Sequence, residues 1–183
     1  MSGEMPHATT LASHILPGLT QDVLWLPIAI FAFRSRSRLE GLGNMSREHF
    51  AVETVLLENA SRDIVSRLVA LDDDGRTNRS FQTLFASMKR EGLEAARTRS
   101  LDRLVKEFRQ TVNGLKVSHR NNYIAHVDTA AEVKPRVLDD PVDFSMAASL
   151  AVNLLDDISG RKIPYFFKLG SNDLIDLRKA LTA

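Results

Sequence analysis

A proline-free stretch between Pro27 and Pro135 covers 107 of the 183 residues of this chain. Within it, glycine occurs only at positions 41, 43, 75, 92 and 114. A chain built from β-hairpins needs turn residues about every 8 to 12 positions, so such sparse punctuation favours long helices. We therefore predict an all-α fold, a single-domain bundle of five to seven helices with no significant sheet.

The spacing of the hydrophobic residues supports this prediction. They recur every three or four positions over residues 52–71, 101–115 and 144–158, as expected for helices that each bury one face. The polar residues 72–80 predict a loop between two helices. Residues 162–167 are the weakest part of the helical prediction.

Residues suited to helix ends divide the chain further. A side-chain oxygen at the N-cap accepts a hydrogen bond from a free backbone N–H, and glycine suits the left-handed position after the last turn. The last helix is predicted to carry Leu174, Leu177 and Leu181. The predicted capping residues are Asn44 or Ser46, Ser80, Asp140 before Pro141, and Asn172 at helix starts, with Gly92 and Gly160 at helix ends.

The N-terminal part of the chain has no early basic cluster of the kind found in targeting signals. We predict a flexible segment over residues 1–19 and one helical domain over residues 20–183. The apolar run from Val23 to Phe33 is about half of the length that a bilayer span needs, so we expect a buried helix there. These features predict a cytoplasmic protein without a membrane partner.

Composition excludes several kinds of site. The chain has no cysteine, so it can form neither disulfides nor thiolate metal sites and has no cysteine nucleophile. Its formal net charge is +1, which gives no general attraction to polyanions, although 17 of its 24 basic residues are arginines. No sequence motif for a metal or another cofactor is present, and we predict none.

The segment Ser118 to Asp128 is the most informative for function. If the preceding helix continues past Gly114, its buried stripe reaches three polar residues, His119, Asn122 and His126. A buried polar group without a partner costs about 1–3 kcal/mol, so a second subunit, water or a ligand should satisfy these side chains.

The long side chain of Arg120 can reach the same cleft, and histidine, arginine and asparagine side chains together suit the cleavage of RNA without a metal ion. A neutral imidazole can remove the proton from a 2′-hydroxyl, an imidazolium can protonate the leaving 5′-oxygen, and a guanidinium can stabilise the negative charge of the phosphorane. One histidine cannot hold both protonation states at once. A two-fold dimer that brings two copies together would supply both.

These residues resemble the signature of the HEPN superfamily, in which an arginine, followed by a polar residue, precedes a histidine with four to six residues between them; five residues separate Arg120 from His126. The block Arg120 to Asp128, RNNYIAHVD, is most similar to that of the HEPN-like proteins of U-type bacterial abortive infection. Residues 63–72 and 80–84 resemble the second-helix region of that group. Because position 128 is an aspartate, the chain is less similar to HEPN toxins with a His-x-Tyr sequence.

The resemblance implies a helical bundle that dimerises through its motif helices and forms a composite cleft between them. It also implies metal-independent ribonuclease activity in a toxin–antitoxin or phage-defence system, with an RNA substrate and an antitoxin or inhibitory partner. Arg120 and His126 then correspond to catalytic residues, and Asn121 to the polar position after the arginine. We assign supporting roles to His119, Asn122 and Asp128.

Two other interpretations stay open. The chain could be a non-catalytic HEPN-like module that binds RNA, a nucleotide or a partner protein, with His126 satisfied in the dimer interface and Arg120 paired with Asp128. It could also be a helical scaffold in which the motif is a coincidence.

Overall fold

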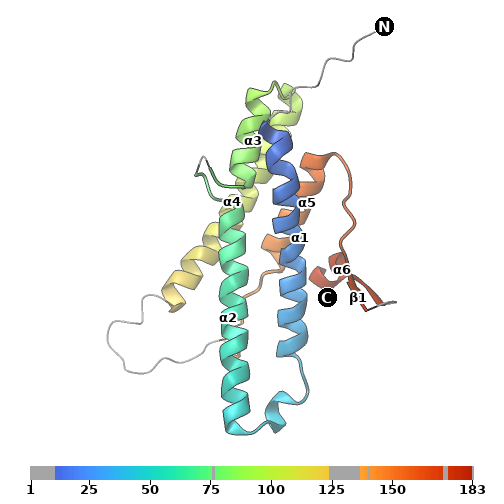
Figure 1. Ribbon diagram of the computed structural model, residues 1–183. Coiled ribbons are helices and arrows are strands. Elements are labelled where there is room, and N and C mark those ends of the chain that lie inside the picture. The colour runs from blue at the N-terminus through green and yellow to red at the C-terminus, as the bar shows by residue number, and fades with distance from the viewer. Residues whose placement is uncertain (1–10, 76, 124–136, 140, 171–172, 183) are drawn as a thin grey trace.

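The computed structural model describes residues 11–75, 77–123, 137–139, 141–170 and 173–182. Within these residues the chain forms six α-helices, one 3₁₀ turn and one small antiparallel hairpin, and the helices pack as a bundle (Figure 1). The predicted all-α bundle of five to seven helices is therefore confirmed. The helices are α1 (Leu11–Ser37), α2 (Arg47–Leu71), α3 (Phe81–Arg90), α4 (Ala95–Tyr123), α5 (Ser145–Ser159) and α6 (Leu177–Thr182), with the 3₁₀ turn at Leu42–Asn44.

Four helix ends have the capping residues that the sequence predicts. The hydroxyl of Ser46 accepts a hydrogen bond from the His49 backbone N–H at the start of α2. Ser80 and Thr83 form a reciprocal capping box at the start of α3, which satisfies two otherwise free N–H groups. Gly92 and Gly160 both have positive φ, which glycine adopts without steric cost, and they follow the ends of α3 and α5.

Helix α1 lies at the centre of the bundle and contacts α2, α3, α5 and α6. Two edge-to-face aromatic pairs join helices of the bundle. Phe81 of α3 packs on Phe108 of α4, and Phe33 of α1 packs on Phe144 just before α5. Such pairs add about 0.5–1.5 kcal/mol beyond the burial of their area. The α1 side chains that are buried in the core are Leu19, Val23, Leu26, Ile30 and Phe33.

Helix α1 is longer than the sequence predicts. It begins at Leu11, inside the segment predicted to be flexible, because Ala12, Ile15 and Leu16 already pack against the core. By length and composition α1 could cross a membrane. Only part of its most apolar stretch is buried in the bundle. The helix expected over Val23 to Phe33 is thus buried on one side only, and Trp25 is 54% exposed.

The start of α5 differs from the prediction. The Asp140–Pro141 pair does not begin the helix, since residues 141–144 are irregular and α5 begins at Ser145. Asp143 takes the expected role of Asp140, because its carboxylate accepts a hydrogen bond from the Ser145 backbone N–H at 2.8 Å.

The C-terminal part contains a hairpin that the sequence analysis missed. Strands β1 (Phe166–Leu169) and β2 (Asp173–Asp176) pair antiparallel, with Phe167 opposite Ile175. This pair packs against the core, whereas Leu174 is exposed, contrary to its predicted place in a helix. Four residues in each strand are too few for their period-2 alternation to stand out in the sequence. Asn172, the predicted cap, lies outside the described residues.

Candidate functional site

The predicted site residues lie at the C-terminal end of α4 and beyond it. Helix α4 continues past Gly114 to Tyr123, as the sequence predicts, so its backbone carries His119, Arg120, Asn121 and Asn122 in the last two turns. The side chains of these four residues lie outside the described part of the structure. His126 and Asp128 lie outside it altogether.

The buried stripe of α4 leads directly to this end. Phe108 and Val112 are buried, and Leu115 is half-buried against the core. The next three side chains, over residues 116–118, are exposed, and the end of α4 diverges from α2 (Figure 1). The last turn of α4 whose side chains are described is therefore only partly buried.

A buried carboxylate lies on the neighbouring helix α2. Glu58 is 6% exposed, and its Oε2 accepts a hydrogen bond at 3.1 Å from the backbone N–H of Val137, which is also buried. Arg62, one turn further along α2, lies with Nε 3.6 Å from the other oxygen of Glu58. Glu58 thus binds the backbone at Val137, the first described residue after the segment that contains His126.

The sequence analysis missed Glu58, because the apolar spacing over residues 52–71 begins with Val52, Val55 and Leu56, and the structure leaves these three exposed. Leu68, Val65 and Ser61 belong to the buried face of α2, and Glu58 continues this face at a helical interval. A charged residue on a buried helix face is rare unless it is paired, as Glu58 is with Arg62.

A second buried carboxylate connects three helices near the other end of α2. Asp72, the residue after the last turn of α2, accepts a hydrogen bond from Gln82 of α3 at 2.9 Å. Arg109 of α4 lies 3.6 Å from its other oxygen. Burial raises the pKa of Asp72, while the hydrogen bond from Gln82 and the charge of Arg109 oppose this effect.

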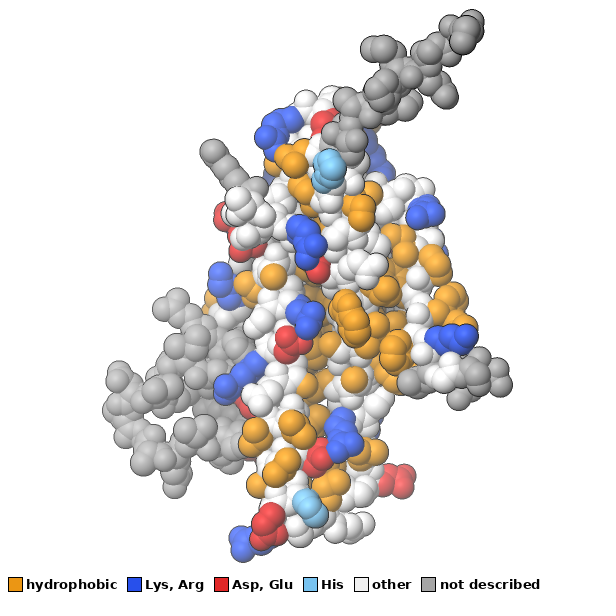
Figure 2. Space-filling model, viewed as in Figure 1, with side chains coloured by type: hydrophobic (Ala, Val, Ile, Leu, Met, Phe, Trp, Pro, Cys, Tyr) orange, Lys and Arg blue, Asp and Glu red, His pale blue; other side chains and the backbone are white. Residues whose placement is uncertain are grey.

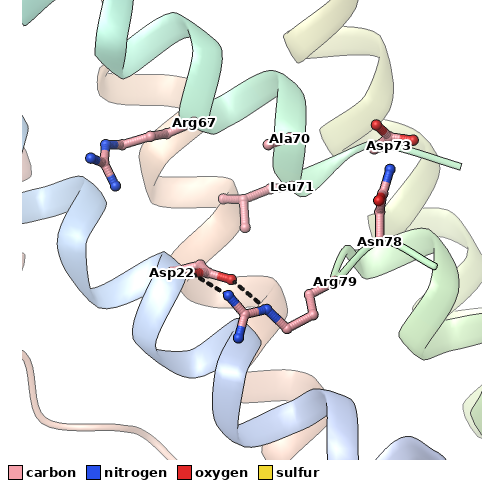
Figure 3. Close-up of a pocket in the computed structure, with 7 residues that line it drawn as sticks. All are labelled: Asp22, Arg67, Ala70, Leu71, Asp73, Asn78 and Arg79. Carbon is pink, nitrogen blue, oxygen red and sulfur yellow. Dashed lines mark hydrogen bonds and ion pairs between the residues drawn. The ribbon is translucent and has the colours of Figure 1, made fainter. Parts of the chain in front are cut away.

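A polar pocket lies between α1, the end of α2 and the following loop, and has a volume of about 430 Å³ (Figure 3). Arg79 of the loop reaches across it to Asp22 of α1, with N–O distances of 3.4 and 3.5 Å. This approach requires the absence of a side chain at Gly18, where a Cβ would lie 2.6 Å from an Arg79 nitrogen. On the far side, the amide of Asn78 points towards Asp73 (Figure 3), and a backbone N–H from Gly75, together with Asn78, lowers the pKa of Asp73.

This pocket does not carry a surplus of positive charge. Its two arginines both have carboxylate partners, because Arg79 pairs with Asp22, and Arg67 pairs with Asp63 at 2.7 Å. Figure 2 shows Lys and Arg side chains interspersed with Asp and Glu over the viewed face, in agreement with the formal net charge of +1. The described surface in this view therefore offers no broad basic area for a polyanion.

Within the described ranges, no group of three or more His, Asp or Glu side chains is placed to hold a metal ion. The chain also matches no known family model, no curated protein and no solved structure. A functional interpretation therefore depends on the motif at the end of α4 and on the residues around it.

Proposed function

We propose that this protein is a metal-independent endoribonuclease of the HEPN type, acting as a toxin or phage-defence effector. The observation that supports this most is the continuation of α4 to Tyr123, which puts Arg120 and Asn121 on a helix end next to the segment with His126. In the proposed site Arg120, Asn121 and His126 act directly, and His119, Asn122 and Asp128 support them.

The proposed reaction is an internal transesterification. The 2′-oxygen of a ribose attacks the adjacent phosphorus, and the bond from phosphorus to the 5′-oxygen breaks. A neutral His126 removes the 2′-hydroxyl proton, and a protonated His126 donates a proton to the 5′-oxygen. Arg120 stabilises the charge on the phosphorane oxygens, aided by hydrogen bonds from Asn121. The products carry a 2′,3′-cyclic phosphate and a 5′-hydroxyl.

A homodimer supplies the two histidines that this reaction uses. Two copies related by a two-fold axis bring the same helix end together from both protomers, so one His126 acts as base and the other as acid. The exposed turn at residues 116–118 supports this arrangement, since a second copy could cover it. We further propose a cytoplasmic location and an antitoxin or inhibitory partner that restrains the activity.

Growth of a bacterial host that expresses the protein tests this proposal. We expect the wild type to arrest growth, and R120A and H126A to relieve the arrest. Matched controls are R103A, which removes an exposed arginine of the same helix, and H49A, which removes an exposed histidine of α2; both should remain toxic. Light scattering on the purified variants establishes that each one retains the oligomeric state of the wild type.

The alternative, a non-catalytic module that binds RNA, a nucleotide or a partner, gives a different result. Under that interpretation, RNA stays intact in the presence of the wild type, and R120A and H126A alter binding or dimerisation alone. An R120A or H126A protein that keeps the dimer and full RNA cleavage would contradict the proposed mechanism.

A further inference from the structure

The face that α1 shares with the N-terminal half of α2 is apolar and exposed. Val52, Val55 and Leu56 of α2 are each more than half exposed, as is Trp25 of α1. Only 28% of the most apolar stretch of α1 is buried. Figure 2 shows hydrophobic side chains gathered over this part of α2. A cluster of large exposed apolar side chains on two packed helices is typical of a surface that binds another molecule.

A groove of about 380 Å³ lies between α1 and α2 on this face. Its apolar lining consists of Ala29, Ala32, Phe33, Leu56, Leu57 and Ala60. The three alanines leave a hollow, because their side chains end at Cβ. Leu56, which is half exposed, projects beside this hollow. The groove therefore offers another molecule both a hollow and a projecting side chain to pack on.

One side chain of each charge also lines the groove. Arg36 of α1 pairs with Glu53 of α2, and its Nε donates to that carboxylate at 2.7 Å. Asp63 of α2 pairs with Arg67 of the same helix, also at 2.7 Å. Arg36 and Asp63 are still about half exposed and can contact a further charge. Glu53 and Asp63 are ten residues apart, so the two pairs are separated by about 15 Å along α2.

The charges and the shape of the groove both fit a second copy of this chain. A two-fold axis perpendicular to α2 at the level of residue 58 lies midway between residues 53 and 63, and also midway between residues 56 and 60. Such an axis places Arg36 opposite the partner's Asp63. The same axis places Leu56 opposite the partner's Ala60, where the groove is hollow. One symmetry operation thus satisfies the charges and the packing together.

We infer that the α1–α2 face is a homodimer interface in which two copies pack about this two-fold axis. The ion pairs of the two copies then form a row of alternating charge: Glu53, Arg36, the partner's Asp63 and the partner's Arg67. Apolar side chains between these rows form the centre of the interface, and charged ones form its ends. This interface is separate from the proposed dimer contact at the end of α4 and goes beyond the proposed function.

Charge reversal tests the predicted contact between Arg36 and the partner's Asp63. In R36E both such contacts of a dimer join two negative charges, and in D63K both join two positive charges. An equimolar mixture of R36E and D63K forms heterodimers in which every contact again joins opposite charges. The changes within each chain are the same in the mixture as in the separate variants, so only the contact between chains differs.

Sedimentation velocity over a range of concentrations measures the dissociation constant of each sample. We expect R36E and D63K alone to raise the dissociation constant of this dimer about tenfold or more, and the mixture to return to within about threefold of the wild type. R103E, which reverses an exposed charge of α4, is the control and should associate as the wild type does.

L56D tests the apolar centre of the same interface. It would bury a carboxylate without a partner, so we expect the dissociation constant to rise about a hundredfold or more. The matched control is V117D, because Val117 is an equally exposed apolar residue that lies on α4, outside the groove. V117D should leave the α1–α2 dimer intact.

Three results would overturn the inference. They are a monomeric wild type, R36E and D63K proteins that associate as strongly as the wild type, and a mixture that associates no better than its components. Dissociation by V117D and not by L56D would assign the assembly to α4 instead. A monomeric wild type that binds phosphatidylcholine vesicles, with loss of binding in L56D, would assign this face to a membrane.

The charge-reversed mixture still decides the question if L56D does not fold, because Arg36 and Asp63 are half exposed and lie outside the core. RNA cleavage is measured separately on the same samples. A protein that dimerises through this face and does not cleave RNA would contradict the proposed function and leave the interface standing.

Discussion

Arg109 of α4 lies with its Nε 3.6 Å from the Oδ2 atom of Asp72, at the point where α2 ends. Gln82 of α3 donates a hydrogen bond to the second oxygen of the same carboxylate. A single aspartate at the end of α2 therefore contacts both α3 and the helix that carries the motif.

The pKa of Asp72 predicts a pH dependence of stability. Burial raises this pKa above the ordinary value of 3.8, so the native state binds a proton more readily than the unfolded chain. The stability that Asp72 contributes is therefore greatest at low pH and decreases as the pH rises through the raised pKa. Asparagine imitates the protonated form at every pH.

We accordingly expect D72N to be more stable than the wild type at pH 7, with a difference that shrinks as the pH falls through the raised pKa of Asp72. Denaturant unfolding at a series of pH values measures this difference. D74N, which alters a carboxylate that is 76% exposed, is the control and should show a much smaller effect. A stability difference that grows towards low pH would contradict a raised pKa of Asp72.

The Phe81–Phe108 pair should dominate the stability of the α3–α4 contact. Phe108 is fully buried, and its ring centre lies 5.2 Å from that of Phe81. Truncation to alanine in F108A leaves a cavity and should lower the free energy of unfolding by about 3–5 kcal/mol. On the same helix Val117 is 57% exposed, so V117A should cost no more than about 0.5 kcal/mol in the same urea titration. Equal losses in the two variants would show that the α3–α4 contact is packed differently.

Arg178 of α6 is expected to hold the last helix and the segment before β1 on α5. Its guanidinium donates to Asp156 at 2.6 Å and to the Ile163 carbonyl at 2.7 Å, and lies 4.7 Å from the centre of the Tyr165 ring. R178A should therefore lower the free energy of unfolding by about 2–3 kcal/mol. The neighbouring variant K179A changes a side chain that is 86% exposed and should stay within about 0.5 kcal/mol of the wild type. If thermal unfolding shows the same loss of stability in R178A and K179A, this anchoring role is ruled out.

At Tyr165 we predict a substitution that does not lower stability. It is 1% exposed, and its hydroxyl finds no hydrogen-bond partner within the described part of the chain. Burial, reinforced by the charge of Asp156, raises the pKa of this phenol. Y165F removes a desolvated hydroxyl and keeps the ring, so we expect stability to be unchanged or to rise by about 1 kcal/mol. A loss of more than about 1 kcal/mol would show that the hydroxyl does have a partner.

The long helices were predictable because the apolar spacing and the capping residues indicate the same helices. Apolar spacing and the capping residues Ser46, Ser80 and Gly160 locate most of α2, α3 and α5 to within one or two residues. The β1–β2 hairpin was not predictable, because each strand is too short for alternation to emerge. The true start of α5 was missed because Asp140 and Asp143 both suit a helix start, and only the fold selects between them.

In the candidate site, too, local features were predictable from the sequence and long-range contacts were not. The motif and its place at the end of α4 follow from local sequence, since the helix does continue past Gly114. The buried contact between Glu58 and Val137, 79 residues away, depends on how the chain packs, which no local pattern encodes.

The most direct test of the proposed ribonuclease is the chemical nature of the ends it leaves on RNA. Purified wild type, H126A and the control H49A are incubated with RNA in an excess of chelator, and the product ends are analysed. We predict that the wild type and H49A produce 2′,3′-cyclic phosphate and 5′-hydroxyl ends and that H126A produces none. Intact RNA with the wild type, products with 3′-hydroxyl ends, or equal cleavage by H126A would contradict the account.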